Sequence, residues 1–90
     1  MRKQELVHAV AEATGQTEAA ATRSVNAVFS AIEESLAKGD DVNISGFGSF
    51  RVVERAARKG RNPQSGYPIT IEARRSPVFR AGTQLKRSVE

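Results

Sequence analysis

The stretch DVNISGFGSFRVV (residues 41–53) marks the point where the periodicity of the sequence changes. Within it, Val42 and Ile44 alternate with polar residues, and the alternation resumes at Phe50 and Val52 after a Gly-Phe-Gly segment. A period of two is typical of β-strands, and glycines between two such runs indicate a turn. The stretch therefore predicts two short strands joined by a tight turn.

Two segments before this stretch carry apolar residues three or four positions apart, which is the spacing of one face of a helix. The first segment ends before Gly15, and the second follows the candidate N-cap Thr17 and ends at Gly39. The apolar positions are Leu6, Val7, Val10 and Ala11 in the first segment and Val25, Val28, Phe29, Ile32 and Leu36 in the second. Two helices joined by a tight turn are therefore predicted.

After Val53 the apolar alternation stops, and it returns only at Ile69 and Ile71. We expect residues 51–53 and 69–71 to pair as strands, with everything between them extended as a long hairpin. We call this hairpin the arm. Its apex is predicted at residues 61–66.

The rest of the chain predicts one more strand and one more helix. Proline cannot donate to a strand ladder, so the strand around Pro77 is expected at a sheet edge, and residues 82–89 are long enough for a short helix. The predicted class is α+β, with helices on one side of a small antiparallel sheet. The ninety residues are expected to form one domain, made of a helical base with the first strand (1–45), the sheet and arm (46–82) and the last helix (83–90).

Composition predicts a small core and a polyanionic partner. Thirteen of the apolar residues are alanine, so few large side chains are available for burial and self-association is expected. Residues 1–45 carry a net charge of −3, residues 46–90 carry +7, and ten of the fourteen cations are arginine. This asymmetry favours nucleic acid over an anionic membrane surface.

Other function classes are disfavoured. The chain has no cysteine for disulfides or thiolate metal sites, and no apolar run reaches the roughly 18 residues of a membrane span. The amino terminus lacks the apolar stretch of a signal peptide, so a soluble, cytoplasmic protein is expected. No cofactor is expected either. His8, the only histidine, is expected beside the inner face of the first helix with no acidic pair near it. No catalytic set can be assembled, and an enzyme is not expected.

The densest positive charge lies on the predicted arm. Cations at residues 51–61 are opposed only by Glu54; they are Arg51, Arg55, Arg58, Lys59 and Arg61. Arg74 and Arg75 follow on the returning strand. A ribbon lined with arginine fits a DNA groove. At the apex, Pro63 is interpreted either as an ordinary turn proline or as a wedge between base steps.

Three motifs at these spacings resemble the bacterial HU and integration host factor family of histone-like DNA-binding proteins. They are GFGSF (residues 46–50), RKGRNPQSG (58–66) and SPVFRAG (76–82), and the resemblance covers essentially the whole chain. The resemblance implies an intertwined dimer, with a helical base, a saddle of sheets and two arms that reach around DNA. Because members of this family insert apolar wedges into the minor groove, it also favours the wedge role for Pro63.

The resemblance also implies which residues act. The implied DNA contacts are Lys3, Arg51, Arg55, Arg58, Lys59, Arg61, Asn62, Pro63, Gln64, Arg74, Arg75, Arg80 and Lys86. The resemblance further implies that Arg74 and Arg75 continue the concave side of the ribbon. The implied dimer core is Phe29, Ile32, Phe47, Phe50 and Phe79. The expected protein is nucleoid-associated, bends and compacts duplex DNA with little sequence preference, and favours bent, nicked or gapped DNA.

Departures from the family pattern and two alternatives accompany this prediction. Thr83 stands where lysine is frequent, Glu18 where a basic residue is frequent, and Val53 where a polar or basic residue is frequent, so weaker non-specific binding is expected. One alternative is a basic hairpin that binds folded RNA. The other is a sequence-selective subunit like integration host factor, which works with an unlike partner. The chain length and the short last helix favour the homodimeric HU type.

Overall fold

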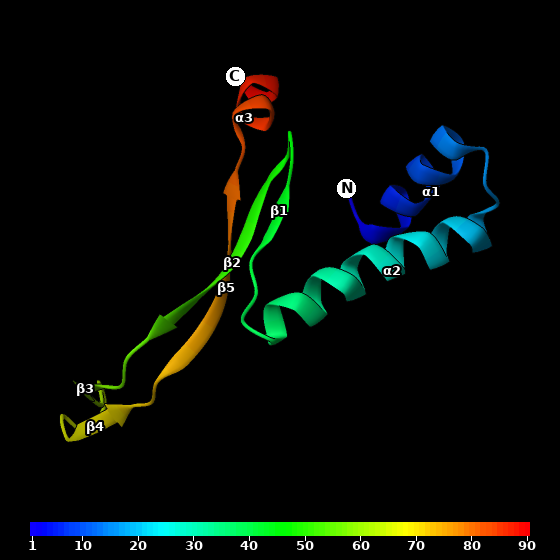
Figure 1. The fold of residues 1–90 in the computed structure, drawn as a ribbon. Coiled ribbons are helices and arrows are strands. Elements are labelled where there is room, and N and C mark those ends of the chain that lie inside the picture. Colours follow the sequence, from blue (N-terminus) through cyan, green and yellow to red (C-terminus); the bar gives the residue numbers. More distant parts are fainter. The chain divides into compact units, whose positions relative to one another are not determined.

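The computed structural model describes residues 1–90, which form three helices and five strands (Figure 1). In chain order they are α1 (Lys3–Thr14), α2 (Glu18–Ala37), β1 (Val42–Ile44), β2 (Gly48–Arg55), β3 (Arg58–Arg61), β4 (Pro68–Ile71), β5 (Arg74–Ala81) and α3 (Thr83–Val89). The chain divides into two compact units, Met1–Ser35 and Leu36–Glu90. The predicted α+β class is confirmed. No helix has the length and apolar character needed to cross a membrane.

The first unit is a helical hairpin held by small apolar side chains. Its buried residues are Val7, Ala11, Ala21 and Val25. Two of the four are alanines, which allow the helices to approach closely. Gly15 ends α1 with a φ of 72°, a left-handed conformation that favours glycine. The Ala20 N–H donates to Thr17 Oγ1 over 3.1 Å, which confirms the predicted N-cap of α2.

The prediction for His8 is wrong, because the side chain is exposed and lies between two carboxylates. Its Nδ1 is 2.6 Å from an oxygen of Glu18, and its Nε2 is 3.1 Å from an oxygen of Glu12. Glu12 lies four residues along the same helix, and the hairpin brings Glu18 from the start of α2. The hydrogen bond to Glu18, followed by the charge of Glu12, raises the pKa of His8 above its ordinary value of 6.5.

This arrangement predicts a pH dependence of stability. The folded state has the higher pKa, so the protonated His8 stabilises it fully below about pH 6.5, and this contribution is lost as the pH rises through the raised pKa. His8→Gln should therefore lower the free energy of unfolding in urea at about pH 5.5 and have little effect at about pH 8.5. Equal effects of His8→Gln at the two pH values would contradict the assignment.

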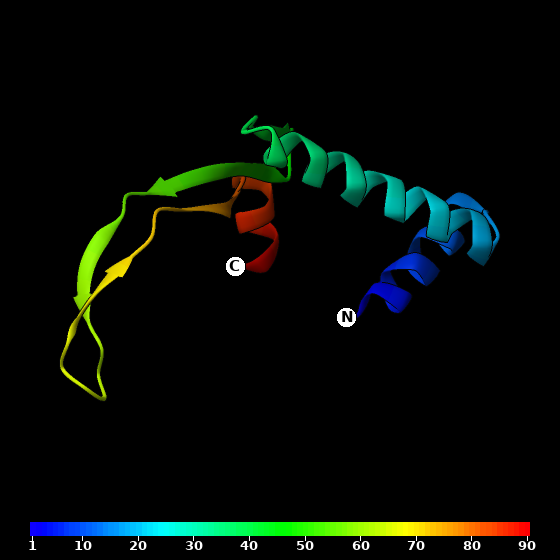
Figure 2. The ribbon, with the colours of Figure 1, turned by 90° about the horizontal axis from the view of Figure 1, so that it is seen from below.

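The second unit contains two antiparallel sheets. The larger has the strand order β1-β2-β5, and the smaller consists of β3 and β4. Gly48 pairs with Ala81 at one end of the β2–β5 ladder and Arg55 with Arg74 at the other, and Pro77 lies on the edge strand β5, as predicted. Figures 1 and 2 both show the β3–β4 hairpin at the opposite end of this unit from α3.

The predicted pairing at the start of the arm is wrong. Residues 51–53 pair with residues 76–78, whereas Ile69 and Ile71 pair with Gly60 and Arg58. Backbone hydrogen bonds do not require apolar side chains, so β2 continues past Val53 to Arg55 although the apolar alternation has ended. The non-strand residues 56–57 and 72–73 then separate the two ladders.

Three phenylalanine rings of the second unit lie together. The Phe79 ring centroid is 4.8 Å from that of Phe50 and 5.4 Å from that of Phe47. Gly48 is buried beside them, and a Cβ there would lie 2.6 Å from Phe79 Cζ, so the site requires glycine. Even so, Phe47 and Phe79 remain 45% and 43% exposed, and Phe29 of α2 is 48% exposed. The single chain therefore leaves much of its predicted aromatic core uncovered.

Candidate nucleic-acid interface

The register of β2 and β5 gathers four arginines on one face of the ribbon. Side chains alternate between the two faces along a strand, and directly paired residues share a face. Arg51 pairs with Val78, Arg55 with Arg74, and Ser49 with Arg80. We call the surface formed by Arg51, Arg55, Arg74 and Arg80 the arginine face. All four of these side chains are exposed.

The opposite face of the ribbon carries Phe50 and Phe79. Arg75 also lies on this face, directly across from Glu54. The interpretation that Arg74 and Arg75 continue one side of the ribbon is therefore wrong, because consecutive strand residues point to opposite faces. Arg75 instead extends toward Gly39, where its Nη2 would be 3.2 Å from an added Cβ.

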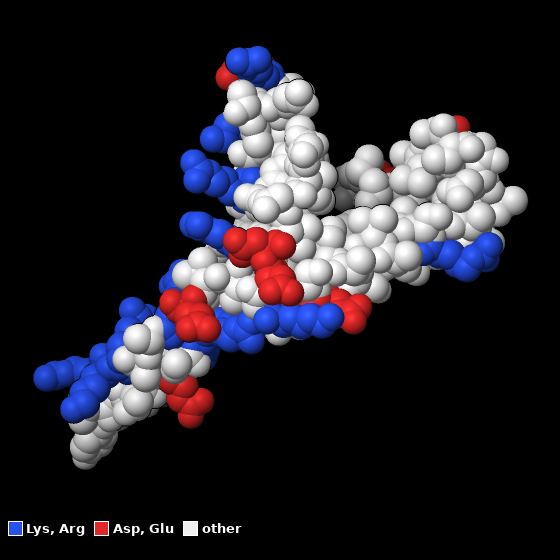
Figure 3. All heavy atoms as spheres, viewed as in Figure 1, with Lys and Arg blue, Asp and Glu red and all other residues white.

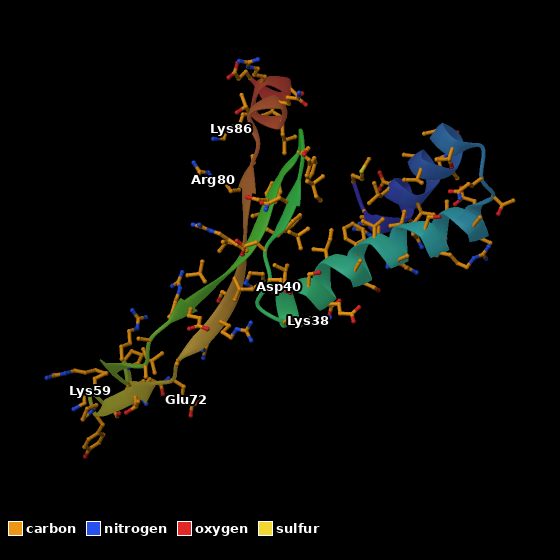
Figure 4. All side chains as sticks on the ribbon, in the orientation of Figure 1. Lys38, Asp40, Lys59, Glu72, Arg80 and Lys86 are labelled. Atoms are coloured by element: carbon orange, nitrogen blue, oxygen red, sulfur yellow. The ribbon has the colours of Figure 1, made fainter.

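The charges on the arginine face are not neutralised within the chain. The ion pairs of the structure are those of His8 with Glu12 and Glu18, and no arginine has a carboxylate within 4.0 Å. Figure 3 shows Lys and Arg atoms along one side of the second unit, from the end near α3 to the arm. In Figure 4, Arg80, Lys86 and Lys59 extend toward this same side. The surface can therefore attract a row of anionic groups.

The arm carries its cations on two faces. Lys59 pairs with Thr70 and Arg61 with Pro68, so these four residues share one face. Arg58 lies on the other face, across from Ile71. Where the two ladders separate, a surface hollow is lined by Arg55, Ala56, Arg58, Ile71, Glu72, Arg74 and Ser76. Basic residues of both ladders, Arg55, Arg58 and Arg74, thus line the same hollow.

The apex of the arm is a turn closed by backbone hydrogen bonds. The Asn62 N–H donates to the Tyr67 carbonyl over 2.8 Å, and the Gly66 N–H donates to the Asn62 carbonyl over 2.7 Å. The Asn62 side chain accepts the Gln64 N–H over 2.9 Å, so Asn62 positions the turn. Pro63 stands exposed at this turn, next to Asn62.

The remaining predicted contacts lie on helices. Lys86 is in the last turn of α3, within the same unit as the arginine face. Lys3 begins α1 in the first unit and is exposed. No group of three His, Cys, Asp or Glu side chains is placed to hold a metal ion.

Tyr67 is an exposed side chain at the apex that the sequence pattern did not bring out. A signal for it was available, since it is the only tyrosine of the chain and the only aromatic residue between residues 51 and 78. Charged residues and the proline dominate the sequence pattern of this segment.

The whole chain is similar to known bacterial DNA-binding proteins. The profile of the family described as bacterial DNA-binding protein matches residues 1–90. The chain is 56% identical to DNA-binding protein HU-1 of Halalkalibacterium halodurans and 52% identical to DNA-binding protein HU of Geobacillus stearothermophilus, each over the full length of both chains. Its structure is similar to that of Anabaena HU in a cocrystal with DNA, with a TM-score of 0.91 and 43% identity, covering 99% of this chain and 97% of the other.

The neighbours Arg74 and Arg75 provide a matched test of the arginine face. Arg74→Ala should weaken binding to all duplex sequences and reduce the slope of log K against log salt by about 0.9 for each lost phosphate contact. Arg75→Ala should change the slope much less, because this side chain lies on the opposite face. Fluorescence anisotropy over a salt series measures both slopes. Equal reductions in the two variants would contradict the assignment of the faces.

Proposed function

The chain belongs to the bacterial DNA-binding protein family that includes the HU proteins, and from this premise we propose that it bends and compacts duplex DNA with little sequence preference. The family match over residues 1–90 and the similarity to HU proteins confirm the family predicted from the three motifs. Within this proposal, residues 1–90 act as one DNA-binding domain in which helices form the base and the sheet carries the arm. The proposed place of action is the nucleoid in the cytoplasm.

The arginine face is the observation that carries this proposal. Guanidinium groups match phosphate geometry, and those of Arg51, Arg55, Arg74 and Arg80 have no carboxylate partner in the chain. Phosphates carry no sequence information directly, so contacts of this kind position the protein without selecting a base sequence. The arrangement supports sequence-tolerant binding along the DNA backbone.

A group that opens a base step produces a sharp bend, and we assign this role to Pro63. The turn at residues 62–66 holds the proline at the apex of a narrow two-stranded arm. A rigid apolar ring placed between bases costs about a few kcal/mol of stacking per step, and the resulting bend brings more of the protein against DNA. A nicked or gapped site has already lost part of its stiffness and should bind more tightly.

The proposed DNA-binding unit is a homodimer with two arms. Phe29, Phe47 and Phe79 are each more than two-fifths exposed in the single chain, although phenylalanine is normally buried. A second copy can cover these rings and supply the second arm. Pairing with an unlike paralogue, as in integration host factor, would cover the same side chains.

Pro63→Ala tests the wedge directly. The variant should keep the salt dependence of binding, because it retains every cation, but it should lose most of the bend and about tenfold of the preference for nicked over intact duplex. Energy transfer between dyes at the duplex ends measures the bend, and anisotropy at matched salt measures the preference.

Pro68→Ala is the matched control for this experiment. Pro68 is on the same arm but pairs with Arg61 within the β3–β4 ladder and is not part of the turn. It should leave the bend nearly unchanged. An unchanged bend in Pro63→Ala would contradict the wedge, and a preference for structured RNA over nicked duplex in the unmodified protein would contradict the proposed function.

A further inference from the structure

Tyr67 places an uncovered aromatic ring at the apex of the arm. It is 74% exposed, in contrast to the phenylalanines of the larger sheet, which contact one another. In Figure 3 the far end of the arm is white, so that neither cations nor carboxylates are visible there. An isolated aromatic side chain in this position has no packing role within the chain.

The backbone around Tyr67 is held in place. Its carbonyl accepts the Asn62 N–H over 2.8 Å, and its own N–H donates to Ser65 Oγ over 3.3 Å. Only the side-chain torsions remain to be ordered when the ring meets a ligand, so the entropic cost of a contact is small. The backbone that carries the ring is therefore held by the turn.

The neighbours of Tyr67 extend the apolar character of this part of the arm. Ile69, two residues further along, is 43% exposed and lies across from Gly60, which has no side chain to cover it. Lys59 and Arg61 occupy the opposite face of the same hairpin. The arm thus has one face with Lys59 and Arg61 for phosphates, and a second face on which apolar side chains stand beside a single cation, Arg58.

Tyr67 also lies close to the proposed wedge. The Asn62 N–H donates to the Tyr67 carbonyl across the turn, so the two residues lie beside each other where the turn closes. Pro63 is the next residue, with a Cα about 3.8 Å from that of Asn62. Since base pairs are stacked about 3.4 Å apart, the Tyr67 ring can reach a nucleotide within one or two base pairs of the wedge.

We propose that Tyr67 is a second DNA-contacting side chain of the arm, whose ring stacks on a base beside the step opened by Pro63. Every base has a flat face that accepts an aromatic ring, so the contact strengthens binding without sequence preference. Unstacked bases at a nick offer this face most readily. The inference rests on the proposed function and adds a base contact to the phosphate contacts of the arginine face.

The chain provides its own probe for this contact. Tyr67 is the only tyrosine and there is no tryptophan, so the intrinsic fluorescence of the unmodified protein near 300 nm reports on this ring alone. Titration with a nicked duplex should quench this emission to the same end point at low and moderate salt. Emission that is unchanged at saturating DNA, with binding verified by anisotropy, would overturn the proposal.

Two substitutions separate stacking from other roles of the side chain. Tyr67→Ala should weaken binding to nicked duplex by about five- to twentyfold while leaving the salt slope unchanged. Tyr67→Phe keeps the ring and should stay within about twofold of the unmodified protein. If Tyr67→Phe loses as much affinity as Tyr67→Ala, the hydroxyl rather than the ring makes the contact, and the stacking proposal is wrong.

The test also distinguishes this inference from the proposed function. If the unmodified protein bends DNA and prefers the nicked duplex while Tyr67→Ala behaves like it, only the Tyr67 contact fails. If tyrosine emission is quenched but neither a bend nor a nick preference is found, the contact stands and the bending function fails. Thr70→Ala, which changes an exposed residue of the adjoining strand β4 without removing a charge or a ring, is the control for general disturbance of the arm.

Discussion

The burial of the phenylalanines is the constraint on which the rest of the structure depends. The chain buries only four apolar side chains, all of them in the α1–α2 hairpin, and two of these are alanines. Apolar burial contributes roughly 25 cal/mol for each Å² removed from water, so half-exposed rings at Phe29, Phe47 and Phe79 leave a large part of the available stabilisation unused. A second copy of the chain that covers them would complete the fold and supply a second arm.

The same packing explains why the positive charge is available for DNA. On the β2–β5 ribbon, Phe50 and Phe79 occupy one face and pack against each other. Alternation then places Arg51, Arg55, Arg74 and Arg80 on the other face, which the aromatic cluster leaves free. The aromatic face anchors the ribbon and fixes its register, and the register decides which arginines lie together. One face of the β2–β5 ladder thus packs, and the other presents the arginine face.

The elements of the fold follow from local signals in the sequence. Gly15 and Thr17 mark the boundary between the first two helices, and the change of period after Asp41 marks the first strand. Strand pairing was harder to predict, because a period of two shows which side chains share a face but does not identify the partner strand. The partner of residues 51–53 therefore does not follow from their sequence, whereas alternation along a strand is by itself enough to separate Arg75 from Arg74.

Contacts between separate helices could not be predicted either, because spacing along the chain does not show which residues of another helix lie nearby. Spacing brings Glu12 to His8, but only the helical hairpin brings Glu18. At the candidate site, the basic residues, the proline and the family motifs were all visible in the sequence. The positioning role of Asn62 depends on the hydrogen bonds of the turn, and the exposure of Tyr67 depends on how the turn folds, so neither follows from residue type. Long-range geometry, rather than residue type, was the missing information.

Two chains are proposed to form the folded, DNA-binding unit, and thermal unfolding at a series of protein concentrations tests this most directly. The midpoint temperature should rise steadily with concentration, because unfolding then separates two chains, and sedimentation at the highest concentration should give twice the 9.7 kDa of one chain. A midpoint that is independent of concentration, together with a mass of 9.7 kDa, would show that the chain folds alone and would contradict the claim.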